Sequence, residues 1–164
     1  MPKPCNTGLW TGAARGTPQR LKLGYHRGIM RALIVGCGQV GSELATALAM
    51  QGMDLAILDR DEDAFLQLPE DFAGATVVGD GLDEEALRRA GIEEAGIFVV
   101  ATAEDNYNLM VAQFVKMKFK VSKIIVRVYD PDKAALFADL SLQTYCPTKE
   151  TAIAIERLIK GEGK

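Results

Sequence analysis

The sequence predicts an α/β fold of the Rossmann type, doubly wound around a mostly parallel six-stranded sheet in a single domain. Three observations lead to this fold class. Six short apolar runs, rich in β-branched residues, alternate with helical patterns from residue 30 onward. The runs are apolar on both faces, as expected of strands that helices cover on both sides. A glycine-rich turn follows the first run.

The predicted strands and helices follow one another in regular order, each strand being an apolar run and each helix a segment with helical periodicity. The strands are residues 31–36, 54–59, 75–79, 97–102, 123–128 and 142–145. The helices are residues 39–52, 61–68, a segment that follows Asp83, and residues 105–120, 131–139 and 148–160. Right-handed crossovers between parallel strands then favour the doubly wound arrangement.

Residues at the ends of these segments support the helix boundaries. Gly52 provides a left-handed stop for the first helix, and Pro69 ends the second. Asp83 is an N-cap followed by two glutamates, which suit the first turn of a helix. The helix at 105–120 finishes in three lysines, which suit its negative end. Pro131 stands at the first position of the next helix, where proline is tolerated.

The composition is that of a folded chain with an acidic main part. A chain of 164 residues, 48% hydrophobic and 25% charged, is enough for one globular domain. Of 19 Lys/Arg and 22 Asp/Glu, residues 1–29 hold five basic and no acidic residues, so residues 30–164 hold 14 basic and 22 acidic, a net of −8. An acidic domain repels the phosphate backbone of nucleic acid, which excludes nucleic acid as the main partner.

Two classes of protein are disfavoured by other features of the chain. The sequence has no apolar run of about 18 residues, the length that a transmembrane helix needs. Its three cysteines stand far apart, without a Cys-x-x-Cys pair. This pattern indicates a reducing compartment rather than a disulfide framework or a zinc site.

Residues 1–29 are expected to be a disordered basic leader, followed by the domain at residues 30–164. The segment contains Gly, Pro, Thr and Arg with little periodicity. A transit peptide is the alternative, because the segment is basic and free of acidic residues, but it lacks an amphipathic pattern and a secretory apolar core. Met30, directly before the first strand, is a candidate alternative start.

The turn after the first strand has the spacing of a dinucleotide-binding motif. Gly36, Gly38 and Gly41 form Gly-x-Gly-x-x-Gly, with Gln39 and Val40 between the last two glycines. The motif alone is weak, but here it follows a strand and opens a helix within a βαβ unit. Gly36 permits the tight turn, Gly38 lets the backbone approach a pyrophosphate, and Gly41 allows the helix to pack closely on the strand. The anion would rest on the amino end of the helix.

Asp59 ends the second strand, 18 residues after Gly41. A carboxylate at this place accepts hydrogen bonds from the ribose hydroxyls and repels a 2′-phosphate. The sequence therefore favours NAD(H) or an adenine mononucleotide over NADP(H). Arg60 complicates this prediction, because a neighbouring arginine can bind a 2′-phosphate. Alternatively, residues 59–61 are a solvated turn with a helix cap.

Other polar residues stand where further strands end, and ligands of such sheets bind at these ends. Asp80 follows the third strand, and Thr102 ends the fourth. Both are candidate ligand-binding residues. Asp105 and Asn106 lie just beyond and could be either ligand-binding residues or ordinary helix caps, and Asp80 could also be a cap.

No catalytic group is evident beside the predicted nucleotide site. The only histidine lies in the leader. Two Tyr-x-x-x-Lys spacings, Tyr129 with Lys133 and Tyr145 with Lys149, imitate the catalytic pair of short-chain reductases. That pair must share one helix, whereas a proline stands inside each spacing here. The sequence thus predicts a cofactor site without a reaction centre, in a protein that is not an enzyme.

Four blocks of the chain together resemble one known family. They are "LIVGCGQVGSELA", "AILDRDEDAF", "VVGDGLDEEALRRAGIEEAGIFVVATAEDNYNLMVA" and "IIVRVYDPDKAALFADL". In this order they resemble the N-terminal nucleotide-binding domain of RCK (KTN, Trk-type) proteins, the regulators of potassium channels and transporters. The resemblance covers residues 31–160.

The resemblance implies a cytoplasmic regulatory subunit that binds NAD(H), or alternatively ADP or ATP, and passes the identity of its ligand to a membrane potassium transporter or channel at the inner face of the cell membrane. By motif position, it assigns the phosphates to Gly36, Gly38, Gln39, Val40 and Gly41, the adenosine ribose to Asp59, the adenine side to Asp80, and the second half of the ligand to Thr102. Arg127 matches a recurring arginine near the site or the subunit contact.

The chain departs from the family pattern at several places. Gln39 stands where ATP-responsive members often carry arginine, and Gly81-Leu82 replaces the more usual Ala-Thr, which weakens the inferred adenine contacts. The family's C-terminal ligand domain is not expected after the last helix, so a second effector site is not inherited.

The last helix carries apolar residues on more than one face. One stripe could pack on its own domain, and the remainder would be exposed unless a second subunit covers it. In the family this helix crosses to a partner subunit, which implies a homodimer or a higher ring. The alternative is a helix buried wholly within its own domain.

Two other functions remain open from the sequence. The first is a small NAD-dependent oxidoreductase, or the cofactor-binding half of one. The second is a nucleotide-binding module that serves a partner unrelated to transport, because the fold alone does not fix the function.

Overall fold

The computed structural model describes residues 30–138, 140 and 142–161. The predicted leader at residues 1–29 lies outside the described residues, as does residue 139 at the end of the fifth predicted helix.

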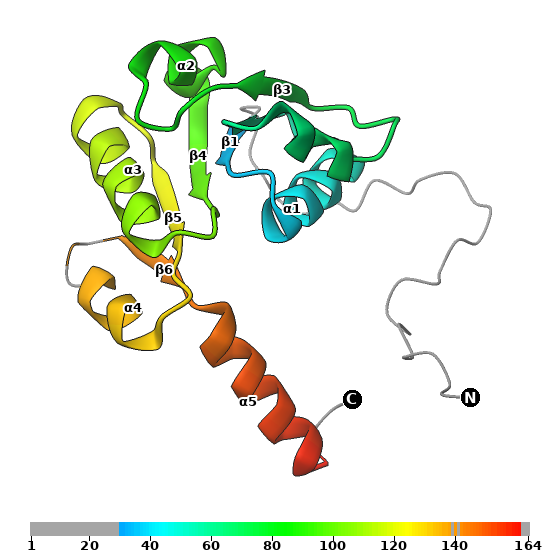
Figure 1. The fold of residues 1–164 in the computed structure, drawn as a ribbon, viewed down its shortest axis with the longest axis vertical. Coiled ribbons are helices and arrows are strands. Elements are labelled where there is room, and N and C mark those ends of the chain that lie inside the picture. Colours follow the sequence, from blue (N-terminus) through cyan, green and yellow to red (C-terminus); the bar gives the residue numbers. More distant parts are fainter. Residues whose placement is uncertain (1–29, 139, 141, 162–164) are drawn as a thin grey trace.

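Six strands form one sheet in which every pairing is parallel. The strands are β1 (Arg31–Val35), β2 (Leu55–Asp59), β3 (Ala75–Val78), β4 (Ala95–Val100), β5 (Lys123–Arg127) and β6 (Gln143–Tyr145). Their order across the sheet is β3-β2-β1-β4-β5-β6 (Figure 1). The chain therefore winds outward from β1 in one direction and from β4 in the other, which confirms the predicted doubly wound fold.

The helices connect the strands in the predicted order. They are α1 (Gln39–Met50), α2 (Glu84–Arg89), α3 (Asp105–Lys118), α4 (Pro131–Ala138) and α5 (Pro147–Ile159), with 3₁₀ helices at Glu62–Gln67 and Ile92–Glu94. Gly52 adopts φ 77° after α1, as predicted. The Asp83 carboxylate caps α2 by accepting from Glu85 N at 2.9 Å, which is also as predicted.

Two elements differ from the prediction in helix type or in their first residue by more than one position, and the other boundaries agree within two residues. The segment expected as a helix at 61–68 is the 3₁₀ helix at Glu62–Gln67. Strand β4 begins at Ala95, two residues before the predicted start at 97. Ala95 extends the pairing of β4 beside β1, with Arg31 as its partner, and the register shifts at Gly96 before Ala32 pairs with Ile97. Small residues without β-branching gave no indication of a strand in the sequence.

The sheet separates two hydrophobic clusters. On one face, Leu33, Val35, Phe98 and Val100 pack with buried residues of α2 and α3. On the other face, Ile34, Ile57 and Val99 pack against α1 and the 3₁₀ helix at Glu62–Gln67. Alternate residues of β1 thus enter opposite clusters, as period-two strand geometry requires.

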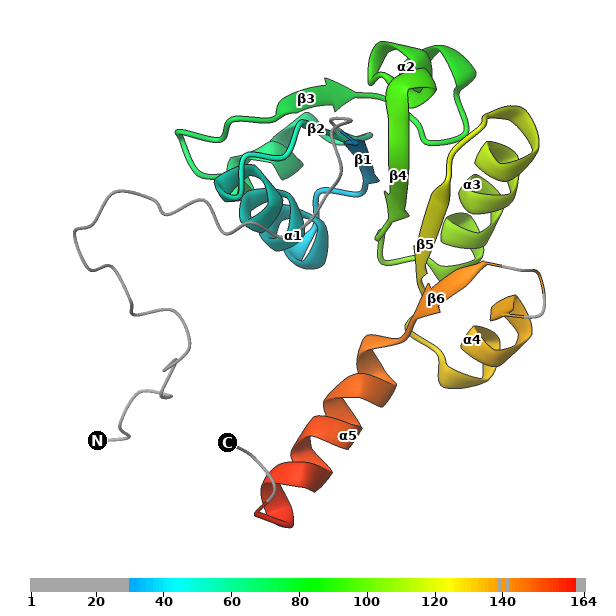
Figure 2. The ribbon, with the colours of Figure 1, turned by 180° about the vertical axis from the view of Figure 1, so that it is seen from behind.

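Helix α5 projects away from the sheet as a separate arm in both ribbon views (Figures 1 and 2). It contains no buried residue, and Ile155, Leu158 and Ile159 are 53%, 67% and 80% exposed. The alternative of a helix buried within its own domain is therefore wrong. The expectation that one stripe would pack on the domain is also wrong, because α5 covers neither face of the sheet.

No helix among the described residues is long and apolar enough to span a bilayer.

Candidate functional site

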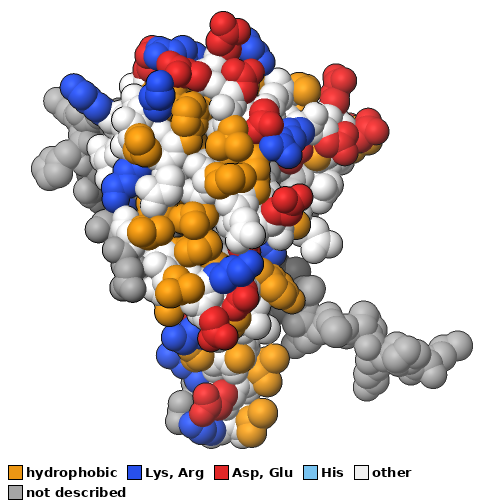
Figure 3. Space-filling view, turned by 60° about the vertical axis from the view of Figure 1, so that its left-hand side comes forward, with side chains coloured by type: hydrophobic (Ala, Val, Ile, Leu, Met, Phe, Trp, Pro, Cys, Tyr) orange, Lys and Arg blue, Asp and Glu red, His pale blue; other side chains and the backbone are white. Residues whose placement is uncertain are grey.

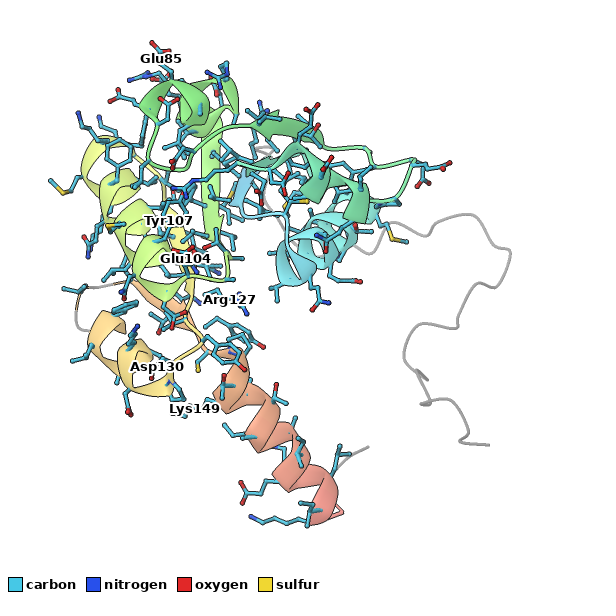
Figure 4. All side chains as sticks on the ribbon, in the orientation of Figure 1. Glu85, Glu104, Tyr107, Arg127, Asp130 and Lys149 are labelled. Atoms are coloured by element: carbon cyan, nitrogen blue, oxygen red, sulfur yellow. The ribbon has the colours of Figure 1, made fainter. Side chains whose placement is uncertain are left out.

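Two clefts lie at the carboxyl ends of the strands, between β1 and β4, where the order in which strands are added to the sheet reverses. Both clefts are lined by Gly36, Asp59, Thr102 and Ala103. The first cleft extends toward Arg60, Gly79 and Tyr107. The second cleft extends toward Gly38, Gln39, Val40 and Arg127. Ligands of open parallel sheets bind at such a reversal point. Figure 4 shows Glu104, Tyr107 and Arg127 grouped near this end of β4, while Lys149 stands apart at the start of α5.

The three glycines of the motif have different physical constraints. Gly36 has φ 100°, and a Cβ there would lie 2.9 Å from Thr102 N. A Cβ on Gly41 would lie 1.8 Å from Gly36 O, so α1 can approach β1 only with glycine at this position. A Cβ on Gly38, in contrast, would meet nothing within 4 Å. The protein itself does not require glycine at 38, which leaves space for a ligand beside the backbone there.

The amino end of α1 opens into the second cleft. Gly38 is the N-cap and provides no side-chain cap, and the first turn carries no acidic residue. The first N–H groups of a helix lack intrahelical partners and attract anions. Gln39 and Val40 are exposed at this end, whereas Gly41 is buried and serves packing rather than contact with a ligand.

Asp59 holds the glycine loop in place. Its Oδ2 accepts from Cys37 N at 2.6 Å, and its Oδ1 accepts from Asp61 N at 3.0 Å. Gln67 adds a second tie by donating from Nε2 to Cys37 O at 3.1 Å. Burial, and secondarily the charge of Asp59, raise the pKa of the Cys37 thiol to about 11, so this thiol is neutral near pH 7. Each carboxylate oxygen of Asp59 retains capacity for one more hydrogen bond.

Arg60, Asp80 and Tyr107 form a compact group beside the first cleft. Arg60 Nη2 lies 2.8 Å from Asp80 Oδ2, and its Cζ lies 4.2 Å from the centre of the Tyr107 ring. The Tyr107 hydroxyl donates to Asp80 Oδ1 at 2.7 Å and accepts from Gly81 N at 2.9 Å. Partial burial acts to raise the pKa of Asp80, but the hydrogen bonds from Leu82 N and Tyr107 and the charge of Arg60 outweigh it, and the net shift is downward.

Asn108 joins Thr102 to Arg127 at the base of the clefts. This fully buried amide accepts from Thr102 N at 3.1 Å and from Thr102 Oγ1 at 2.5 Å. Its Nδ2 donates to Thr102 O at 2.9 Å and to Arg127 O at 3.0 Å, so all four of its hydrogen-bonding positions are used. Arg127 Nη1 also donates to Thr102 O at 2.9 Å, while its buried Nε has no hydrogen-bond partner among the described residues.

Asn108 and Tyr107 are not among the site residues predicted from the sequence. Asn108 is spaced i, i+3, i+4 and i+7 from Val111, Ala112 and Val115, which are all fully buried. A polar residue on the apolar stripe of a predicted helix must find partners in the interior. That position could have identified Asn108 as the polar anchor of the site.

Asp105 and Asn106, which the sequence left between caps and ligands, are both engaged within the protein. The Asp105 carboxylate accepts from Tyr129 N at 2.7 Å and from Asp130 N at 3.0 Å, and thus fixes the turn between β5 and α4. Asn106 Oδ1 accepts from Lys133 Nζ at 3.3 Å. Neither residue lines either cleft.

The two Tyr-x-x-x-Lys pairs are divided between secondary-structure elements. Tyr129 precedes α4, which contains Lys133, and Tyr145 ends β6, whereas Lys149 lies in α5. Neither pair shares a helix, so neither has the arrangement that a short-chain reductase needs.

The sheet order, the glycine turn and the clefts at the reversal point place the chain in the class of Rossmann-type domains. Residues 32–146 match the family model described as the TrkA-N domain, and the chain belongs to this family. It is 40% identical over 134 residues to the Trk system potassium uptake protein TrkA of Streptomyces coelicolor. That match covers 82% of this chain and 60% of the relative, so the chain spans about three fifths of the relative's length.

Solved structures share the same fold. The RCK domain of GsuK superposes with a TM-score of 0.72 at 20% identity, over 85% of this chain and 30% of that one. The C-terminal domain of Kef from Shewanella denitrificans, in its AMP-bound form, has a TM-score of 0.67 at 22% identity and covers 82% of both chains. The GsuK channel bound to NAD has a TM-score of 0.61 at 20% identity, over 75% of this chain and 22% of that one.

Proposed function

We propose that this chain is the nucleotide-binding part of a regulator of potassium uptake. It binds NAD(H), or alternatively ADP or ATP, and passes the occupancy of its site to a membrane transporter or channel. The observation that carries the proposal is the open amino end of α1 at Gly38, which faces a cleft beside the Asp59 carboxylate. Membership of the TrkA-N family and the potassium uptake relatives support the transport role.

The residues of the site divide the ligand between the two clefts. The backbone at Gly36, Gly38, Gln39 and Val40 receives the phosphates, while Gly41 lets α1 approach. Asp59 accepts from the adenosine ribose, and Arg60 and Asp80 border the adenine side. Thr102 and Arg127 border the second half of the ligand. The AMP-bound Kef domain and the NAD-bound GsuK channel support an adenine nucleotide as the ligand.

The proposed role as a regulator of potassium uptake also implies a location, a membrane partner and an assembly. The protein acts in the cytoplasm at the inner face of the cell membrane, as a homodimer or higher ring in which α5 contacts a second subunit. Exposed Ile155, Leu158 and Ile159 support this assembly, because a helix that exposes such side chains needs a cover. Figure 3 shows hydrophobic side chains along the projecting lower part of the molecule.

Nucleotide binding is tested by thermal unfolding of the full chain with NADH, NAD⁺, NADPH, AMP, ADP and ATP. A ligand at about 100 times its Kd adds roughly 2.7 kcal/mol of stability, equivalent to a shift of about 5–10 °C for a domain of this size. We expect NADH or an adenine nucleotide to give this shift. If none of these ligands changes the unfolding temperature, the proposal is wrong.

The regulatory role needs a separate test on the membrane partner. Nucleotide can bias the partner only by its differential affinity for two arrangements, typically about 1–3 kcal/mol. We expect nucleotide to change potassium flux through the co-expressed transporter by a factor of about 5–150. A bound nucleotide that alters neither assembly nor flux contradicts the regulatory role and leaves only a binding module.

A further inference from the structure

The first cleft is lined by Arg60, which pairs with two other side chains of the protein. Arg60 follows Asp59 directly, so it stands where an arginine would bind the 2′-phosphate of an NADP-type ligand. Its side chain is 54% exposed. Instead, its guanidinium pairs with Asp80 and stacks on the ring of Tyr107.

The two partners of Arg60 are themselves fixed. Asp80 Oδ1 accepts from the Tyr107 hydroxyl at 2.7 Å and from Leu82 N at 2.8 Å, which leaves Oδ2 for the guanidinium. Tyr107 is only 7% exposed, and its hydroxyl also accepts from Gly81 N. An exposed ion pair is weak alone, but here the same guanidinium also stacks on a buried ring. Arg60 is therefore held by two anchored partners, and its release requires one of them to change.

We propose that Asp80 and Tyr107 sequester Arg60 and thereby determine the preference of this site for a free ribose 2′-hydroxyl over a 2′-phosphate. The inference rests on the proposed nucleotide function and adds a selectivity device to it. Asp59 repels a 2′-phosphate directly, and Asp80 withholds the cation that would compensate this repulsion. Selectivity thus depends on a carboxylate that follows a different strand from the ribose-binding one.

The test compares two ligands that differ only in the 2′-phosphate. Isothermal titration of the full chain gives the Kd of 5′-AMP and of adenosine 2′,5′-bisphosphate, and their ratio cancels any contact that both ligands share. The variants are Asp80→Asn, Arg60→Gln and the double variant. Asp61→Asn is the matched control, because it removes a neighbouring carboxylate that lines the other cleft and is not the ion-pair partner of Arg60. Thermal unfolding checks that each variant folds.

We expect the wild-type chain to bind 5′-AMP at least tenfold more tightly than the bisphosphate. Asp80→Asn releases Arg60 and lowers the ratio of the Kd of the bisphosphate to the Kd of 5′-AMP by about tenfold. Asp61→Asn lowers this ratio by less than about threefold. Arg60→Gln alone leaves the Kd ratio nearly unchanged. In the double variant, the loss of Arg60 abolishes the decrease that Asp80→Asn causes. This non-additivity is the signature of a cation that acts only when released.

Three outcomes would contradict the proposed role of Asp80 and Tyr107 in different ways. An unchanged ratio in Asp80→Asn overturns the inference and leaves nucleotide binding intact. A narrowed ratio that persists in the double variant also overturns it, because the effect would then come from lost negative charge alone. If the wild-type chain does not bind 5′-AMP, the inference falls together with nucleotide binding at this site.

Discussion

The loop of Gly36, Gly38 and Gly41 differs from helix α5 in how completely contacts within the chain occupy its side chains and backbone groups. Around the loop, Asp59 ties Cys37 and Asp61, and Asn108 uses all four of its hydrogen-bonding positions. Helix α5 contains no buried residue. The loop thus takes its shape from contacts within one chain, whereas α5 keeps its apolar side chains exposed.

The largest expected effect comes from packing α1 more loosely on β1. In Gly41→Ala the new Cβ would lie 1.8 Å from Gly36 O, so the helix must move away from the loop. We expect a loss of roughly 3 kcal/mol or more in the free energy of unfolding, because overpacking against backbone cannot relax cheaply. Urea denaturation measures the loss. A cost below about 1 kcal/mol would show that the loop does not depend on this contact.

Removing the buried amide beside the site is expected to have the next largest effect. Asn108→Ala leaves Thr102 N and Thr102 O with fewer partners in a buried setting, which costs about 2–3 kcal/mol. Asn106→Ala is the matched control on the same helix, because Asn106 is exposed, and we expect it to cost less than about 0.5 kcal/mol. Equal losses in the two variants would contradict the role assigned to Asn108.

The closure of the loop can be measured through Cys37. Its pKa of about 11, against an ordinary value of 9.0, predicts roughly 100-fold less thiolate than a free thiol at pH 8. Because the Cys37 side chain is also fully buried, alkylation by iodoacetamide, followed on a variant that retains only this cysteine, should be slowed by at least this factor. The urea-unfolded chain provides the control. A folded chain that reacts as fast as the unfolded one would show an open loop.

A substitution on the exposed face of α5 is expected to have the smallest effect on folding. Its effect on assembly should be large. Leu158→Glu changes a side chain that is 67% exposed, so we expect less than about 0.5 kcal/mol in the stability of the isolated chain. If α5 is the contact between subunits, the same change should abolish dimers in sedimentation equilibrium. Lys149→Glu, at the start of the helix, tests whether charge alone has this effect. Dimers that persist in Leu158→Glu would place the contact elsewhere.

The strands and most helices could be predicted because their periodicity is local. The glycine turn and Asp59 could also be predicted, since their spacing places them at adjacent strand ends. The partners of Arg60 could not, because Asp80 and Tyr107 lie on separate elements that only the folded sheet brings together. The role of Asp105 depends on the turn at Tyr129, far along the chain. The direction of α5 could not be predicted either, because an apolar helix face does not specify what covers it.

Whether the glycine loop holds the phosphates of a nucleotide can be decided with the single substitution Gly38→Ala. Gly38 has φ −78° and ψ −169°, which alanine adopts without strain, and its Cβ would meet no protein atom within 4 Å. Isothermal titration with NADH and ADP should therefore show binding weakened at least tenfold, while the free energy of unfolding stays within about 1 kcal/mol of the wild type. Unchanged affinity in a stably folded Gly38→Ala chain would contradict the claim, because a ligand on the loop cannot approach the backbone past a methyl group.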